Sequence, residues 1–157
     1  MELSDKVINF FKKQSFVIVS TIDLDGRIHC SAKGIAGIHK NGHVFVVDLY
    51  HNKTYGNLNN DPRVSITQVD EHSFTGYTLT GQAKIVLKDD ISDDYIKEWE
   101  KRVLKRMSDR LIKSVQSEKV SSAHYEAQLP EEPKYLIEID VESVIDLAPP
   151  YRSREER

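Results

Sequence analysis

Three consecutive residues, Asn52-Lys53-Thr54, carry the chemical groups needed to bind an anion such as phosphate. They open a short polar stretch from His51 to Asn60 that stops at Asp61-Pro62, and we interpret this stretch as a helix with Asn52 at its N-cap. The first backbone N–H groups of a helix have no intrahelical partner, and Lys53 and Thr54 would add a full positive charge and a hydroxyl donor there. The alternative is an ordinary capped surface helix with a solvated lysine.

The alternating stretch from Arg27 to Ile38 is a second candidate, because a period of two predicts a β-strand. One face would carry the mostly small residues Ile28, Cys30, Ala32, Gly34, Ala36 and Ile38, and the other would carry His29, Ser31, Lys33 and Ile35. A planar ligand can lie along such a strand and take hydrogen bonds from its backbone, with Ser31 and Lys33 as polar neighbours. The alternative is a barrel strand whose small residues leave room for a crossing element.

Other kinds of chemistry find less support in the sequence. Among the six histidines, His39 and His43 are separated by the hairpin signal Asn41-Gly42, and none has a carboxylate at a characteristic spacing, so no metal site is expected. Nucleophile-elbow and glycine-rich phosphate-loop motifs are absent from the sequence. The single cysteine, Cys30, has small apolar neighbours and is expected to be a buried packing residue rather than a nucleophile.

The elements that would position these residues are mainly strands. Besides Arg27–Ile38, alternation or β-branched runs predict strands at Phe16–Ile22, Val44–Val47, Val64–Val69, Thr75–Leu87 and Tyr135–Val141, with Val144–Leu147 as a candidate continuation. Helical periodicity marks Leu3–Lys13 and a stretch from Ser92 to about residue 115, and 117–133 is expected to be a polar loop. Gly76 and Gly81 predict bends or a close approach within their strand. Six strands in sequence-adjacent antiparallel order predict a closed or nearly closed barrel, a mainly β fold with peripheral helices.

Length and composition limit the classes of function that remain. With 157 residues, the chain fits one domain, expected at 1–147, followed by a charged C-terminal tail at 148–157. A net charge of −3 disfavours general nucleic-acid binding, and one cysteine excludes a disulfide framework. No stretch approaches 18 apolar residues, so we expect no membrane association and a soluble, cytoplasmic protein.

Several segments, taken in order, resemble a known family. They are Val17–Asp23, Asp25-Gly26-Arg27, Ser31–Ala36, Asn41-Gly42, Val44–Asp48, Asn52-Lys53-Thr54, Asn57–Val64 and Leu79–Ala83. Their order and spacing resemble the flavin-binding split-barrel superfamily that includes pyridoxamine 5′-phosphate oxidase. The resemblance covers roughly residues 15 to 87, more than half of the chain.

The resemblance implies a six-stranded antiparallel split β-barrel that binds FMN at the interface of a homodimer, with each site built from both chains. Asn52, Lys53 and Thr54 would then bind the FMN phosphate. The flavin ring would lie along Ser31, Ala32, Lys33 and Gly34 and against the strand end Val46, Val47 and Asp48. An FMN-dependent oxidoreductase with an unknown substrate follows as the implied function, with no catalytic residue assigned.

Departures from the oxidase pattern argue against pyridoxamine phosphate as the substrate. Ser31 stands where the oxidase has a basic residue, Lys53-Thr54 replaces a basic pair, and Pro150–Arg154 does not match its C-terminal arginine-containing motif. Two alternatives therefore remain beside the enzyme. One is a flavin carrier or electron-transfer protein without small-molecule turnover, and the other is a split barrel that binds haem, a deazaflavin or no cofactor.

Overall fold

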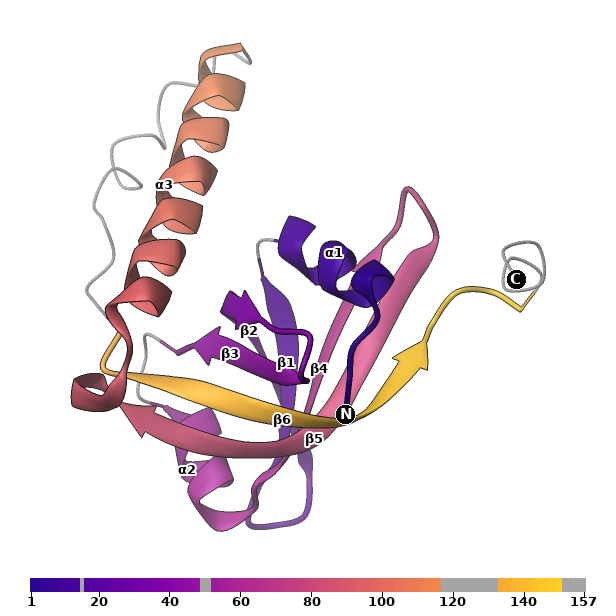
Figure 1. The fold of residues 1–157 in the computed structure, drawn as a ribbon, viewed down its shortest axis with the longest axis vertical. Helices are drawn as coiled ribbons and strands as arrows, with labels where there is room; N and C mark the ends of the chain where they lie inside the picture. Colours follow the sequence, from indigo (N-terminus) through magenta and orange to yellow (C-terminus); the bar gives the residue numbers. More distant parts are fainter. Residues whose placement is uncertain (15, 49–51, 117–132, 151–157) are drawn as a thin grey trace.

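The computed structural model describes residues 1–14, 16–48, 52–116 and 133–150, and it contains six strands and three α-helices in these ranges (Figure 1). The elements are α1 Asp5–Lys13, β1 Val17–Ile22, β2 Ile28–Ile38, β3 His43–Val47, α2 Lys53–Asn60, β4 Arg63–Asp70, β5 Thr75–Leu87, a 3₁₀ turn Lys88–Asp90, α3 Asp93–Gln116 and β6 Tyr135–Asp146. Each predicted strand and helix is present within a few residues of its expected bounds. Most of the expected loop at 117–133 and most of the tail at 148–157 lie outside the described residues.

The six strands form a closed antiparallel barrel in the order β1-β2-β3-β6-β5-β4, which confirms the predicted mainly β, split-barrel fold. The expected strictly sequence-adjacent order is wrong at one step. β3 pairs with β6, and β4 pairs with β1, so that consecutive strands β3 and β4 are not neighbours. The chain between them contains α2, which carries it to the other side of β1 and thereby lets the sheet close on itself.

Alternating side chains fill the barrel interior. Val17 and Val19 of β1, Ile66 of β4, Leu79 of β5 and Ile137 of β6 are completely or almost completely buried in one apolar cluster. On one side of the barrel α1 adds Val7, Ile8 and Phe11 to this cluster, together with Leu3 just before the helix, while α2 lies on the opposite side (Figure 1). Ser4 caps α1 by accepting a hydrogen bond from the Val7 N–H at 3.4 Å, which satisfies one of the free donors of the first turn.

The two faces of β2 differ from the prediction, because a register shift between Ile35 and Gly37 interrupts the alternation. Ile35 and Ile38 both join the barrel core, whereas Ala36 between them is buried on the outside beneath α3. A bulge of this kind puts one extra residue into a strand and moves the following side chains to the other face. Ala36 therefore keeps its predicted outward face, and the predicted single face from Ile28 to Ile38 is wrong at Ile38, which packs in the core.

Cys30 was expected in the core, and this expectation is wrong. It lies in the first half of β2 on the outward face and is exposed, with its Sγ 3.3 Å from the hydroxyl of Ser20. The inward positions at this end of β2 are taken by the polar residues His29, Ser31 and Lys33, which leaves the small residues outside.

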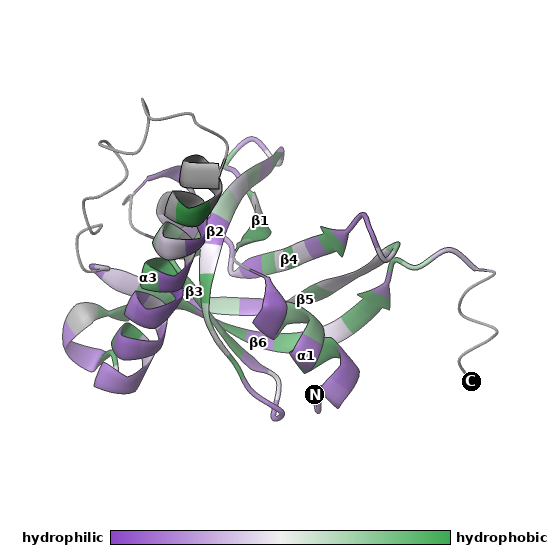
Figure 2. Cartoon of the chain, turned by 90° about the horizontal axis from the view of Figure 1, so that it is seen from above, coloured by the Kyte–Doolittle hydropathy of each residue, from purple (hydrophilic) through white to green (hydrophobic). Residues whose placement is uncertain are grey.

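The long helix α3 packs on the outside of the barrel rather than at its end. Trp99 and Val103 on one face of α3 are buried with Ala36, Val47 and Leu136 in a second apolar cluster. Figure 2 shows green stretches along the part of α3 nearest the sheet and purple ones on turns facing away from it. The outer face of β2 and β3 is thus covered over its second half and left open over its first half.

A close approach of the backbone of β6 explains why residue 81 of β5 is a glycine, and the sequence predicted a bend or close approach at this position. A Cβ at Gly81 would clash with the carbonyl oxygen of Asp140 on β6, at a register shift between Thr80 and Gly81. A Cβ at Gly76 would come within 2.7 Å of a Val69 side-chain carbon. Both glycines therefore allow β5 to bend and pair tightly on both sides.

Candidate functional site

The exposed start of α2 lies beside the turn that joins β1 to β2. Asn52 occupies the N-cap position as predicted, but its side chain makes no capping hydrogen bond. The first N–H groups of the helix therefore lack a side-chain acceptor from the cap residue. Lys53 extends from the first helical position with about half of its side chain exposed, and its Nζ donates to Asp23 Oδ2 at 3.3 Å.

One oxygen of the Asp23 carboxylate already accepts hydrogen bonds from the turn in which this residue lies. Its Oδ1 accepts the backbone N–H groups of Asp25 and Arg27 at 3.0 and 2.8 Å. The Arg27 N–H, more than the Lys53 ammonium, holds the pKa of Asp23 below its ordinary value. Because the carboxylate has these backbone donors, Lys53 can turn toward another anion without leaving Asp23 unsatisfied.

The opposite face of α2 rests on a polar layer at the barrel wall. The hydroxyl oxygens of Thr54 and Ser31 lie 3.1 Å apart, and Asn57 Nδ2 donates to Thr21 Oγ1 at 2.9 Å. Thr54, Asn57 and Thr21 are all buried. Two hydroxyl groups that share one hydrogen bond keep a second proton, so the Ser31–Thr54 pair retains a donor. These contacts fix the start of α2 against β1 and β2.

A buried charge cluster lies next to this layer. The side chain of Asp48 is fully buried, and its Oδ1 accepts a hydrogen bond from Lys33 Nζ at 2.6 Å, while its Oδ2 accepts one from the Tyr135 hydroxyl. The Tyr135 ring packs edge-on against Tyr55 of α2, with ring centres 4.9 Å apart. Burial, followed by the hydrogen bond to the Asp48 carboxylate, raises the pKa of Tyr135 far above its ordinary value, which keeps the hydroxyl a proton donor.

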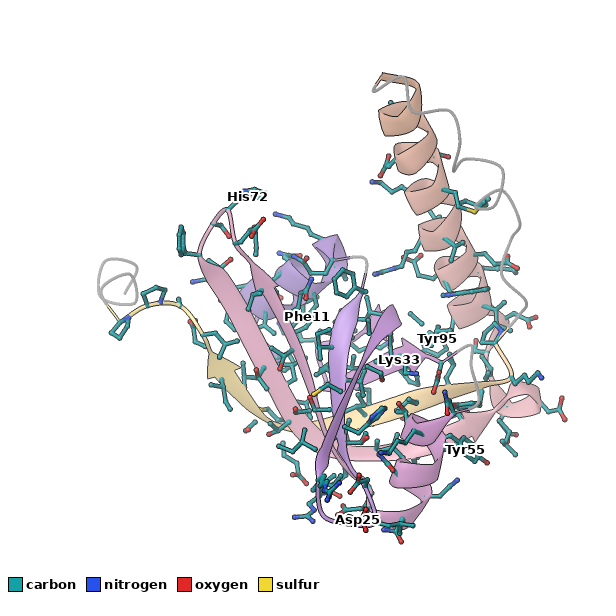
Figure 3. All side chains as sticks on the ribbon, turned by 180° about the vertical axis from the view of Figure 1, so that it is seen from behind. Phe11, Asp25, Lys33, Tyr55, His72 and Tyr95 are labelled. Carbon is teal, nitrogen blue, oxygen red and sulfur yellow. The ribbon has the colours of Figure 1, made fainter. Side chains whose placement is uncertain are left out.

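Figure 3 labels Lys33, Tyr55 and Asp25, which mark β2, α2 and the β1–β2 turn around this region. The structure therefore brings together five of the predicted site residues from three segments of the chain: Ser31, Lys33, Asp48, Lys53 and Thr54.

The remaining predicted site residues have different surroundings. Ala32 is exposed on the outward face of β2, and Gly34 is half-buried. Val46 points into the barrel core and Val47 packs beneath α3, so neither side chain is open to a ligand.

Outward residues next to Ala32 form a broad uncharged face across five strands, here called the open face. Residues that pair across β2, β1, β4, β5 and β6 give two rows on it: Ala32, Ile18, Thr67, Thr78 and Ile145 in one, and Cys30, Ser20, Ser65, Thr80 and Ser143 in the other. None of these ten residues carries a charge, in a chain in which 30% of residues are charged. Exposed Ile28 and Val69 extend the same face.

Sequence reasoning missed several partners in this region. Asp23 was named only as the end of the resembling segment Val17–Asp23, and Tyr135 only as a strand residue, although both hold a predicted site residue. Asn57 belonged to the resembling segment Asn57–Val64, which was the one available signal for its role. Tyr135 lies 87 residues from Asp48 along the chain, and no local pattern links the two.

Comparison with known proteins decides the family. A family model described as pyridoxamine 5′-phosphate oxidase matches residues 3–147 of the chain. The chain belongs to the pyridoxamine 5′-phosphate oxidase family. No curated protein sequence gives a significant match.

Solved structures at low sequence identity share the fold of this family member. HupZ from Group A Streptococcus is similar with a TM-score of 0.64 and 16% identity, over 92% of this chain and 94% of that one. General Stress Protein 26 from Bacillus anthracis gives a TM-score of 0.56 and 17% identity, over 91% and 92% of the two chains. An F420 reductase is similar with a TM-score of 0.62 and 13% identity, over 91% of this chain and 98% of that one. These structures therefore share the split-barrel fold of this chain.

Two kinds of feature are absent from the described residues. No described helix is both long and apolar enough to cross a membrane. Within the same residues, no group of three or more His, Cys, Asp and Glu side chains is placed to hold a metal ion.

Proposed function

We propose that this member of the pyridoxamine 5′-phosphate oxidase family binds FMN as a homodimer and acts as an FMN-dependent oxidoreductase. The observation that carries the proposal is the start of α2, where a half-exposed Lys53 lies next to backbone N–H groups that receive no hydrogen bond from the cap side chain and to the Ser31–Thr54 hydroxyl pair. This set of donors suits a terminal phosphate, because it combines a positive charge, the positive end of a helix and a directed hydroxyl.

The residues present fit the two ends of FMN differently. Lys53, the first N–H groups of α2 and the hydroxyl pair would hold the phosphate. The backbone of β2 around Ala32, where small residues leave the outward face open, would hold the ring. When bound, FMN supplies hydride and electron transfer, which the side chains of this chain cannot supply by themselves.

The Lys33–Asp48 pair sets the charge that this region offers a ligand. Because Asp48 neutralises the Lys33 ammonium, the pair presents almost no net charge, and Lys53 remains the cation with the freer side chain. Lys53 would therefore attract the phosphate, while Lys33 and Asp48 hold the end of β3 against β2.

The open face supports the homodimer. Uncharged, largely aliphatic and hydroxyl-bearing sheet surface of this breadth favours protein contact over solvent, because charged residues are depleted from the centres of interfaces. Ala32 belongs both to this face and to the proposed ring segment, so a second copy packed there would lie next to the flavin. Each site would then be built from both chains.

Purified protein titrated with FMN tests the cofactor. We expect saturable, equimolar binding, followed as quenching of flavin fluorescence, and a Lys53→Ala variant should bind at least about tenfold more weakly, because it loses a charge-assisted contact to phosphate. Lys40→Ala removes an exposed lysine on the β2–β3 hairpin and should bind FMN like the parent. If the parent protein shows no saturable FMN binding in this titration, the proposal is overturned.

Anaerobic addition of NADH or NADPH separates the enzyme from a flavin carrier. An enzyme that takes electrons from these donors would lose its flavin absorbance on mixing, whereas a carrier would keep it until a partner reductase is added. A preparation that binds haem or a deazaflavin in preference to FMN would show instead that the barrel serves another cofactor.

A further inference from the structure

A groove of about 670 Å³ lies between the C-terminal end of α1 and the middle of α3, away from the candidate flavin site. Figure 1 shows α1 and α3 on the same side of the barrel. The lining comes from both helices: Lys12, Lys13, Gln14, Glu98, Lys101, Arg102, Lys105 and Asp109. None of these residues belongs to the set predicted to bind FMN.

The side chains that line this groove carry a net positive charge. Five cations face two carboxylates, and each carboxylate already has a partner on α3: Glu98 accepts from Arg102 at 3.2 Å, and Asp109 accepts from Lys105 at 3.1 Å. Lys12, Lys13 and Lys101 are exposed, and no ion pair is found for them within the described part of the chain. Three uncompensated ammonium groups therefore border the same space.

Two features raise the electrostatic energy of these three ammonium groups, and a bound anion would lower it. Like charges repel, and the repulsion inside a groove is screened less well than on a convex surface. The C-terminal end of α1, where Lys12 and Lys13 lie, stabilises only charges close to its own last turn, and it does not compensate Lys101 on the other helix. The arrangement thus leaves a place for a ligand with about three negative charges.

The rest of the molecule limits the kind of anion. The groove residues carry a net charge of +3, so the remainder of a chain with net charge −3 carries −6. A nucleic-acid backbone or a broad anionic surface would be repelled by that remainder, whereas a small ligand would meet the groove alone. Ammonium groups on flexible stems bind phosphate oxygens well, and their methylene stems can cover an apolar ligand part.

We propose that this groove binds a small anion whose charge is carried by a diphosphate group. A nucleoside diphosphate and inorganic pyrophosphate share this chemistry, and both have the charge that the groove lacks. This site is separate from the proposed FMN site, so the test of this proposal does not depend on whether the protein binds FMN.

Trp99, the single tryptophan of the chain, is buried between α3 and the barrel rather than in the groove, so binding is measured by isothermal titration calorimetry. ADP, pyrophosphate or sulfate is added to the full-length protein at constant ionic strength. We expect ADP and pyrophosphate to bind saturably and more tightly than sulfate. Tighter binding of ADP than of pyrophosphate would identify a nucleoside diphosphate as the source, and equal binding would identify the diphosphate alone.

Paired variants connect the binding to the groove. Lys12→Gln/Lys101→Gln should weaken ADP or pyrophosphate binding about tenfold or more, because it removes one ammonium from each wall. Lys40→Gln/Lys84→Gln changes the net charge equally on residues outside the groove and should bind like the parent. All four lysines have exposed side chains, and matching circular dichroism spectra would verify the fold.

Three outcomes would overturn the proposal. One is diphosphate binding no stronger than that of sulfate, and another is equal weakening in both double variants. The third is preference for a single-stranded oligonucleotide over ADP, which would assign the groove to nucleic acid instead.

Discussion

Asp48 should be sensitive to a single substitution, because it is a fully buried carboxylate that accepts hydrogen bonds from Lys33 and Tyr135. Replacing one member of a buried ion pair leaves the other charge without compensation and costs about 3–5 kcal/mol. We therefore predict that Asp48→Asn lowers the free energy of unfolding by about this amount in urea denaturation without added FMN. Asp25→Asn, in the exposed β1–β2 turn, should change it by less than about 0.5 kcal/mol.

A second variant separates the uncompensated charge from a general packing defect. In Asp48→Asn/Lys33→Met both charges are gone, and replacement of a buried ion pair by uncharged groups is often close to neutral. The double variant should thus regain much of the stability that the single variant loses. Equal stability of the single and double variants would show that any loss comes from altered packing around residue 48 and not from an uncompensated Lys33 charge.

At the scale of elements, two glycines should respond to the same substitution with opposite signs. Gly81→Ala places a Cβ against the Asp140 carbonyl in the middle of the β5–β6 pairing and should lower the free energy of unfolding by about 1–3 kcal/mol. Gly56→Ala lies within α2, where no atom lies within 4 Å of the new Cβ, and should raise it by about 0.5–1 kcal/mol. Urea denaturation of both variants measures the difference, and a Gly81→Ala protein as stable as the parent would contradict the close approach.

The elements were largely predictable from the sequence, because their determinants are local. Alternation along β5, the Asn41-Gly42 hairpin and the helical spacing of α3 each lie within a few residues of chain. The register shift after Ile35 was not predictable, since a bulge depends on how β2 pairs with β3 rather than on β2 alone. The same holds for Cys30, whose exposure follows from which face of β2 the rest of the barrel occupies.

At the scale of the whole molecule, closure of the barrel depends on pairs that are distant in the chain. Alternation shows that β3 and β6 are strands, but their pairing joins His43 to Asp140, and the pattern of each strand is compatible with several neighbours. The candidate site depends on the same closure. Tyr135 at the start of β6 reaches Asp48 only because β6 runs beside β3, so sequence reasoning named Lys33 and Asp48 as candidates but missed the buried cluster that they form with Tyr135.

The open face leads to the last prediction, which concerns assembly. A stable homodimer buries about 1,200–2,000 Å² in total, and a sheet face that spans five strands is wide enough to provide it. Ser65 lies near the middle of this face, paired with Ser20 on β1 and Thr80 on β5. We predict that the parent protein sediments as a dimer in analytical ultracentrifugation and that Ser65→Arg raises the dissociation constant about a hundredfold or more, because a desolvated arginine would have no partner there.

Glu71→Arg is the matched control for this prediction. It introduces the same side chain at the tip of the β4–β5 hairpin, where the Glu71 side chain is 88% exposed, and should leave the sedimentation of the parent unchanged. If Ser65→Arg also releases FMN while Glu71→Arg retains it, the second chain contributes to the flavin site, as we propose from the position of Ala32 on the same face. A monomeric parent that binds FMN would contradict the shared site, and would leave the open face for another partner.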